Sequence, residues 1–144
     1  MKVDITINEP LFFPLANRPV LRGYAEFADI PENRSILVYP FDEIAAEKTI
    51  ALTDPARNEP QDLYDLWYLT VNKEVQLDHR IPAICQKLEF REKRCEDLRA
   101  ALTRKEARLR ALWNTRLSYQ MAALPPFKQV FRELRRTFRQ ANLP

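Results

Sequence analysis

Three charged residues stand in otherwise apolar surroundings and have side chains that could act on a phosphate group. They are Lys48, Asp62 and Asp65. A lysine ammonium is a compact, mobile point charge that suits contact with phosphate oxygens. Two carboxylates that share a buried site need a cation or a catalytic reason, because like charges oppose each other's ionisation. These residues therefore form a candidate phosphate-handling site, in which we expect Lys48 to lie close enough to pair with at least one of the two aspartates.

Each of the three residues also has a simpler structural explanation. Lys48 can pack its stem on the flank of a helix while its ammonium reaches water. Asp62 and Asp65 are expected in the first turn of a helix that begins at Pro60, and carboxylates there cap free amides and oppose the helix dipole. The residues alone leave both explanations open.

Two predicted helices position these side chains. The first begins at Phe41, and its apolar residues recur at the spacing of one helical face that also carries Lys48. These apolar residues are Phe41, Ile44, Ala45, Ala51 and Leu52. The second begins after a proline and is apolar or aromatic on nearly every side, which is typical of a buried helix. Asp62 and Asp65 are its only charges, and their spacing places them on one face.

Two segments of this region carry a recognisable signature. EIAAEKTIAL at residues 43–52 and QDLYDLWYL at residues 61–69 closely resemble the paired motifs of the AbiEii/AbiGii-type nucleotidyltransferase toxins. This family is a branch of the polymerase-beta-like nucleotidyltransferase superfamily. The opening MKVDITINEPLFFPLANRPVL is similar to the strand and loop of that family, so the resemblance extends from residue 1 to about residue 71. The two motifs at this separation are more specific than either motif alone.

The resemblance implies catalytic roles for four residues. Lys48 matches the motif lysine that is expected to bind nucleotide phosphates, and Asp62 and Asp65 match the two aspartates of an RDxxD motif. Asp4, in the alternating segment KVDITI, matches the third carboxylate of the metal site. From the residues alone, Asp4 is equally consistent with a solvent-facing position on a strand.

The sequence departs from the family pattern in two places. Gln61 stands where the family has the arginine of RDxxD, which removes a bidentate partner for a carboxylate or phosphate. The chain also has a single glycine, Gly23, and no Asp-x-Asp, whereas the family opens with a glycine pair and an Asp-x-Asp strand. Two-metal nucleotidyl transfer requires several convergent carboxylates. We therefore expect a Mg²⁺ site only if another chain completes it.

Composition indicates a single soluble domain with a real core. The chain has 144 residues, of which 46% are hydrophobic and 30% are charged. No segment is apolar enough to span a membrane, and the first residues do not resemble a signal or transit peptide, so we expect a cytoplasmic protein with no membrane partner.

Cys85 and Cys95 match neither a disulfide framework nor a zinc spacing and are predicted to be free core thiols.

The two halves of the chain differ in charge. Residues 1–79 carry 7 lysines and arginines against 14 acidic residues, and residues 80–144 carry 16 against 6. The net charges of −7 and +10 make the second half a candidate surface for RNA or another polyanion. A solvated helical face is the alternative explanation.

The remaining elements are predicted from patterning. Residues 1–8 and 35–39 are predicted strands, and the proline-rich residues 9–34 are predicted to be a loop. Strands without neighbours would invite pairing with another chain. From Ile81 onward, apolar residues recur every seven positions with interruptions, which favours two or three packed helices over a continuous coiled coil, with Trp113 closing their core.

A last helix is predicted after Pro125 and Pro126. It has an apolar stripe surrounded by basic residues, among them Arg132, Arg135, Arg136 and Arg139. Three interpretations remain open for this helix. It can dock on the core, present its arginines to RNA phosphates, or lie on an anionic membrane surface.

Taken together, the sequence predicts an α+β chain that is predominantly α-helical. Residues 1–40 are expected to form a strand-loop-strand remnant of the nucleotidyltransferase sheet, and residues 41–144 a helical region of the same domain. The resemblance implies the C-terminal part of a toxin that transfers a nucleotide from a nucleoside triphosphate to RNA or protein. We expect this part to be inactive alone, and its partners to be an upstream N-terminal nucleotidyltransferase chain or an antitoxin. A non-catalytic helical module that binds protein or RNA is the alternative.

Overall fold

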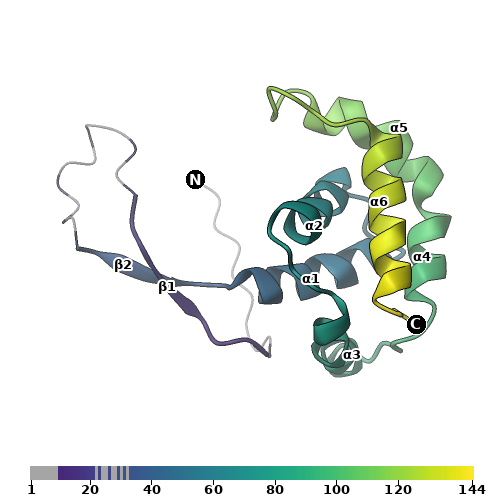
Figure 1. Cartoon of the computed structure of the whole chain (residues 1–144), viewed down its shortest axis with the longest axis horizontal. Helices are drawn as coiled ribbons and strands as arrows, with labels where there is room; N and C mark the ends of the chain where they lie inside the picture. Colours follow the sequence, from purple (N-terminus) through teal and green to yellow (C-terminus); the bar gives the residue numbers. More distant parts are fainter. Residues whose placement is uncertain (1–9, 22, 24–25, 27–28, 30, 32) are drawn as a thin grey trace.

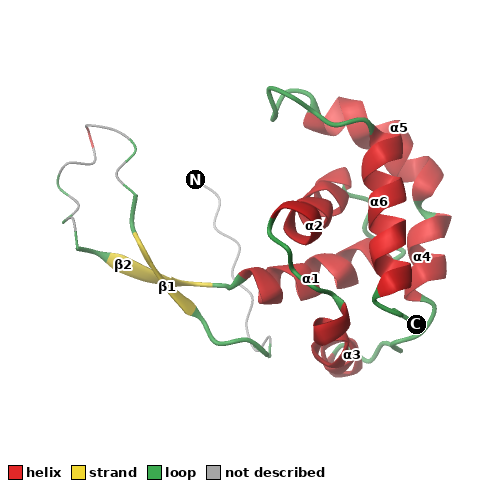
Figure 2. Ribbon diagram, in the orientation of Figure 1, coloured by secondary structure: helices red, strands yellow, loops and turns green. Residues whose placement is uncertain are grey.

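A computed structural model describes residues 10–21, 23, 26, 29, 31 and 33–144. Within these residues the chain forms a two-stranded sheet followed by six α-helices (Figures 1 and 2). The elements are β1 (Ala16–Pro19), β2 (Ser35–Val38), α1 (Phe41–Thr53), α2 (Pro60–Asn72), the 3₁₀ turn η2 (Asp78–Arg80), α3 (Ile81–Phe90), α4 (Leu98–Arg104), α5 (Glu106–Leu117) and α6 (Phe127–Gln140). The predicted α+β class with mostly helical content is confirmed. The strand expected over residues 1–8, which includes Asp4, lies outside the described residues.

The sheet is a hairpin that projects away from the helices (Figure 1). β1 pairs antiparallel with β2, so that Ala16 lies opposite Val38 and Pro19 opposite Ser35. β2 confirms the strand predicted over residues 35–39. β1 corrects the prediction of an irregular loop over residues 9–34, because its sequence ANRP has little strand propensity and is extended through pairing with β2.

The core forms around α1 and α2. α2 packs against α1, α5 and α6, and α1 packs against α3 and α4. Leu63 and Leu66 of α2 are fully buried, as are Ala45 and Ala46 of α1. The prediction that α2 is buried on nearly every side is wrong, because Tyr68 is partly exposed on its outer face.

The basic half folds into separate helices, which confirms the prediction of packed helices over a continuous coiled coil. Trp113 is buried in α5, as predicted, and its indole N–H donates to the carbonyl of Pro125 at 3.0 Å. The apolar stripe of α6, formed by Phe127, Val130, Phe131, Leu134 and Phe138, is buried. Because α6 packs against α2, α4 and α5, its docking on the core is confirmed and the membrane-surface interpretation is wrong.

Cys85 and Cys95 form a disulfide, which corrects the prediction of free thiols. That prediction assumed that both residues lie in helices. The structure shows instead that α3 ends at Phe90 and that Glu92 adopts a positive φ. This turn brings the two Cα atoms within 5.0 Å of each other.

None of the helices in the described part of the chain is long and apolar enough to cross a membrane.

Candidate functional site

The lysine of α1 and the two aspartates of α2 meet where these helices pack together. Lys48 Nζ donates to Asp62 Oδ1 at 2.8 Å and lies 2.7 Å from Asp65 Oδ2. The expected pairing of Lys48 with an aspartate is therefore confirmed. The catalytic and nucleotide-binding roles assigned to these residues stay predictions, as does the metal-binding role of Asp4, which lies outside the described residues.

Arg57, which precedes α2, supplies a second cation to Asp62. Its Nε donates to Asp62 Oδ2 at 2.5 Å, and its terminal nitrogen donates to Oδ1 at 3.3 Å. Asp62 thus has the bidentate arginine that the motif would place at Gln61. No side-chain hydrogen bond caps α2, so Asp62 does not cap a free amide. It does lie in the first turn of α2, where its charge opposes the helix dipole as expected. Lys105 of the α4–α5 junction donates to the Arg57 carbonyl and anchors this segment.

The ion pairs of the cluster formed by Lys48, Arg57, Asp62 and Asp65 determine the ionisation state of Lys48 and Asp62. Burial lowers the pKa of Lys48, but its hydrogen bonds to Asp62 and Asp65 outweigh this effect and leave the pKa raised. Burial likewise raises the pKa of Asp62, yet the hydrogen bonds from Arg57 and Lys48 leave it lowered. Lys48 is therefore an ammonium and Asp62 a carboxylate at neutral pH. Such a group acts through its charge and position and not by exchanging a proton.

We expect Asp62 to make the stability of the protein sensitive to acid. Its pKa is lower in the folded chain than its ordinary value of 3.8, so the unfolded chain takes up the proton at the higher pH. The free energy of unfolding must then rise with pH across this interval and fall as pH drops through the folded pKa. Urea unfolding below about pH 5 should show this decline.

The variant Asp62→Asn should flatten that acid dependence, because the amide cannot take up the proton. Glu96→Gln is the matched control, since Glu96 is exposed and its contact with Arg94 at 3.5 Å is weak. Parallel pH profiles for Asp62→Asn and the unmodified protein would show that Asp62 does not carry the effect.

A second and more deeply buried charge network lies on the neighbouring face of α1, and sequence reasoning missed it. Lys87 of α3 lies 2.7 Å from Glu43 Oε1 and 2.6 Å from Glu47 Oε1, and it donates to the Pro10 carbonyl. Glu43 Oε2 accepts the backbone N–H groups of Phe12 and Phe13, each at 3.1 Å. The network therefore ties the segment before β1 to α1 and α3.

Glu47, which precedes Lys48 in the EIAAEKTIAL motif, has a structural role. Its carboxylate bridges Lys87 and Arg91, the latter at 2.7 Å. Burial raises the pKa of Glu47, but the hydrogen bonds from Lys87 and Arg91 outweigh burial and lower it. Within this motif, Glu47 thus holds α3 while Lys48, the next residue, faces α2. The only available sequence signal was the four-residue spacing of Glu43 and Glu47, which places them on one helical face.

The residues of the cluster do not by themselves fit Mg²⁺. The described residues contain no group of three or more His, Cys, Asp or Glu side chains that could hold a metal ion. Both oxygens of Asp62 already accept hydrogen bonds, and Asp65 is paired with Lys48. Because Mg²⁺ requires near-octahedral oxygen coordination, a bound ion would need further ligands.

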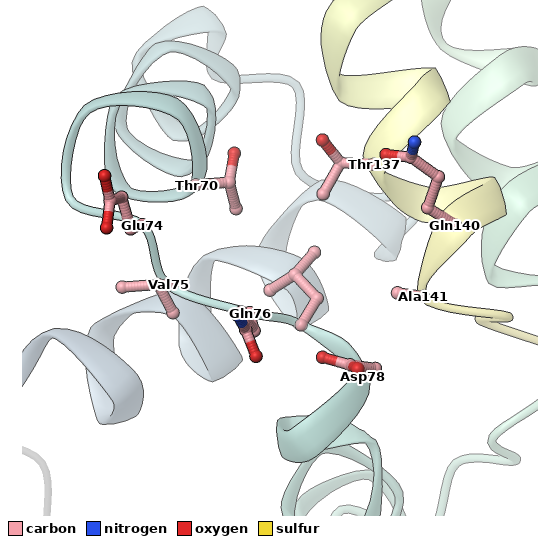
Figure 3. Close-up of a pocket in the computed structure, with 9 residues that line it drawn as sticks. Thr70, Glu74, Val75, Gln76, Asp78, Thr137, Gln140 and Ala141 are labelled. Atoms are coloured by element: carbon pink, nitrogen blue, oxygen red, sulfur yellow. The ribbon is translucent and has the colours of Figure 1, made fainter.

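A polar hollow of about 500 Å³ lies between the C-terminal ends of α2 and α6 (Figure 3). Thr70, Thr137 and Gln140 line it together with the carboxylates of Glu74 and Asp78, and no lysine or arginine lines it. Helix C-termini and carboxylates both repel anions. This hollow is therefore unsuited to a phosphate.

The four arginines predicted to contact RNA are exposed on α6, and their contact with RNA stays a prediction. They are Arg132, Arg135, Arg136 and Arg139. Arg132, Arg135 and Arg139 line a hollow of about 240 Å³ that also includes Lys128 and Glu106. The Glu106 carboxylate is paired with Arg110. Arg136 is exposed on the same helix but is not among the lining residues.

The chain matches a known protein family. The family model described as nucleotidyl transferase AbiEii toxin, type IV toxin–antitoxin system, matches residues 1–140. Comparisons with curated proteins and with solved structures give no match.

Proposed function

The chain belongs to the AbiEii family of nucleotidyl transferase toxins of type IV toxin–antitoxin systems, and on this premise we propose that it supplies the phosphate-binding part of a nucleotidyl transfer site. In this proposal Lys48 binds the phosphate oxygens of a nucleoside triphosphate. Asp62 and Asp65 hold the ammonium in position until the nucleotide arrives. The family implies an antitoxin as a partner.

The observation that carries this proposal is that one half-buried lysine bridges two carboxylates at the family motif. The Lys48 side chain is 23% exposed, whereas that of Asp62 is only 2% exposed. Asp62 keeps Arg57 as a partner if Lys48 turns away, and Asp65, at 30% exposure, can be hydrated. Lys48 can therefore exchange Asp65 for a phosphate oxygen without leaving a buried charge unpaired.

The metal-binding carboxylates that the sequence lacks would come from another polypeptide in this proposal. The β1–β2 hairpin is a suitable place for that chain to attach, because no third strand among the described residues pairs with either of its edges. Ile36 and Leu37 of β2 are 55% and 67% exposed although they point to opposite faces. A two-stranded hairpin with apolar residues on both faces is marginal by itself, and a partner sheet would cover it. Mg²⁺ would bind only with the carboxylates of that chain.

We expect Lys48→Met to weaken binding of a nucleoside triphosphate to the purified chain by at least about tenfold, since a charge-assisted hydrogen bond contributes roughly 1.5–3 kcal/mol. Isothermal titration calorimetry with each triphosphate measures this effect. Lys73→Met is the matched control, because Lys73 is exposed at the C-terminal end of α2 and its substitution removes the same charge. Asp65→Asn should strengthen binding, since it releases Lys48 from one carboxylate.

Equal triphosphate affinities for Lys48→Met and Lys73→Met would contradict the proposal. The cluster would then be an electrically neutral clamp between α1 and α2, as its two cations and two carboxylates also permit. That result favours the second candidate function, a non-catalytic helical module that binds protein or RNA.

A further inference from the structure

Arginines from two helices surround one groove on the basic side of the protein. A hollow of about 500 Å³ between α4 and α6 is lined by Arg99, Arg104, Arg135 and Arg139 above a floor that includes Leu102 and Phe138. Arg135 and Arg139 also line the adjoining hollow of about 240 Å³. The two hollows therefore form one surface, which we call the α4–α6 groove.

The cations of this groove lack protein partners. In the described part of the chain, no hydrogen bond, ion pair or ring contact involves the side chain of Arg99, Arg104, Arg135 or Arg139. Lys48, Arg57 and Lys87, by contrast, are each paired with a carboxylate. Like charges gathered without counterions repel one another, so this groove favours an anion that spans several positions.

The lining of the hollow between α4 and α6 is mostly apolar, but no large hydrophobic side chain is exposed there. Leu102 and Phe138 in its floor are each only 1% exposed. The large hydrophobic side chains that are exposed in the described residues lie on the segment before β1, the hairpin, α1, α2, the α3 terminus and the loop after α5. Protein interfaces depend on buried apolar and aromatic anchors. A phosphodiester backbone needs only cations at intervals, and bases gain nothing here because no exposed aromatic ring is present for stacking.

We propose that the α4–α6 groove binds the phosphodiester backbone of a nucleic acid, without sequence preference, through Arg99 and Arg104 of α4 together with Arg135 and Arg139 of α6. Binding of a nucleic-acid backbone requires only the arginines of this groove. The use of the groove to place the acceptor of nucleotidyl transfer rests on the function proposed above. The inference adds two arginines of α4 to the surface expected from the sequence and places Arg136 outside the groove.

The test measures binding of a labelled single strand of about 16 nucleotides by fluorescence anisotropy across a salt series. The double variant Arg99→Gln/Arg104→Gln should bind at least about tenfold more weakly near 50 mM salt, and its log–log salt slope should flatten by about 1.4, since each lost contact to a single strand removes about 0.7. Adding Arg135→Gln and Arg139→Gln should double the change in slope.

Arg108→Gln/Arg116→Gln is the control, because both residues are exposed on α5, outside the groove, and the change in charge is the same. An equal loss of affinity in this control would overturn the proposal, since it would show only attraction to net charge. RNA and DNA strands of one sequence distinguish the source of the backbone, and tighter binding of either supports the groove. Displacement of both by polyglutamate at equal charge concentration would overturn it in favour of an acidic protein.

The binding test is independent of the proposed function. Lys48→Met should leave binding of the strand unchanged while it weakens triphosphate binding. If the strand does not bind but Lys48 still binds triphosphate, the groove proposal alone is contradicted. If the strand binds but Lys48→Met leaves triphosphate binding unchanged, the proposed transfer site alone is contradicted.

Discussion

Replacing Lys87 with methionine should lower the free energy of unfolding by about 3–5 kcal/mol, because removing one member of a buried ion pair leaves an uncompensated charge. The side chains of Lys87 and Glu43 are 0% and 1% exposed. Methionine fills a similar volume, so a cavity contributes little to the loss. A domain of this size is stable by only about 5–15 kcal/mol, and urea unfolding at neutral pH should therefore show a large shift in midpoint.

The double variant Glu43→Gln/Lys87→Met is the control for this effect. It removes both charges, and the glutamine oxygen can still accept the N–H groups of Phe12 and Phe13 that Glu43 binds. We expect it to recover a large part of the stability lost in the single variant, since the coupling between contacting residues makes their effects non-additive. A single variant within about 1 kcal/mol of the unmodified protein would show that the network does not hold the segment before β1 to the helices.

The pairing of Lys48 with Asp62 and Asp65 could be predicted because it depends on short-range patterns. Helical spacing placed Lys48 on a face of the first helix and both aspartates on one face of the second. A short connection between two helices then leaves few ways to pack them. The same reasoning predicted the buried stripe of α6 from its repeating phenylalanines.

The role of Arg57 as a partner of Asp62 could not be predicted in the same way. Its contact with Asp62 crosses the turn between α1 and α2, and the direction of an arginine side chain there depends on the path of that turn. The motif indicated only that a cation was missing at Gln61. The absence of the expected arginine, with another arginine four positions earlier, was the available signal.

The Glu43–Lys87 network and the disulfide depend on tertiary arrangement. Lys87 meets Glu43 only because α3 packs against α1, and charged side chains are rarely buried unless they are paired. Cys95 reaches Cys85 only because the chain reverses after α3. β1 similarly becomes a strand through pairing with residues far along the chain. No local pattern specifies these contacts.

The central claim is that Lys48 and its aspartates form one part of a transfer site whose metal-binding carboxylates come from another polypeptide. The most direct measurement is incorporation of a labelled nucleotide into RNA or protein with Mg²⁺ or Mn²⁺. We expect none with the chain alone, because the described residues hold no set of metal ligands. The polypeptide encoded immediately upstream, if it carries the glycine pair and the Asp-x-Asp, should restore transfer.

In the restored reaction, Lys48→Met should lower the rate by about 10²–10³, the usual cost of losing one preorganised group that stabilises developing charge. Lys73→Met, with the same loss of charge, should leave the rate unchanged. These results together would support the claim. Reproducible incorporation by the chain alone that disappears in Asp4→Ala, or a restored rate unaffected by Lys48→Met, would contradict it.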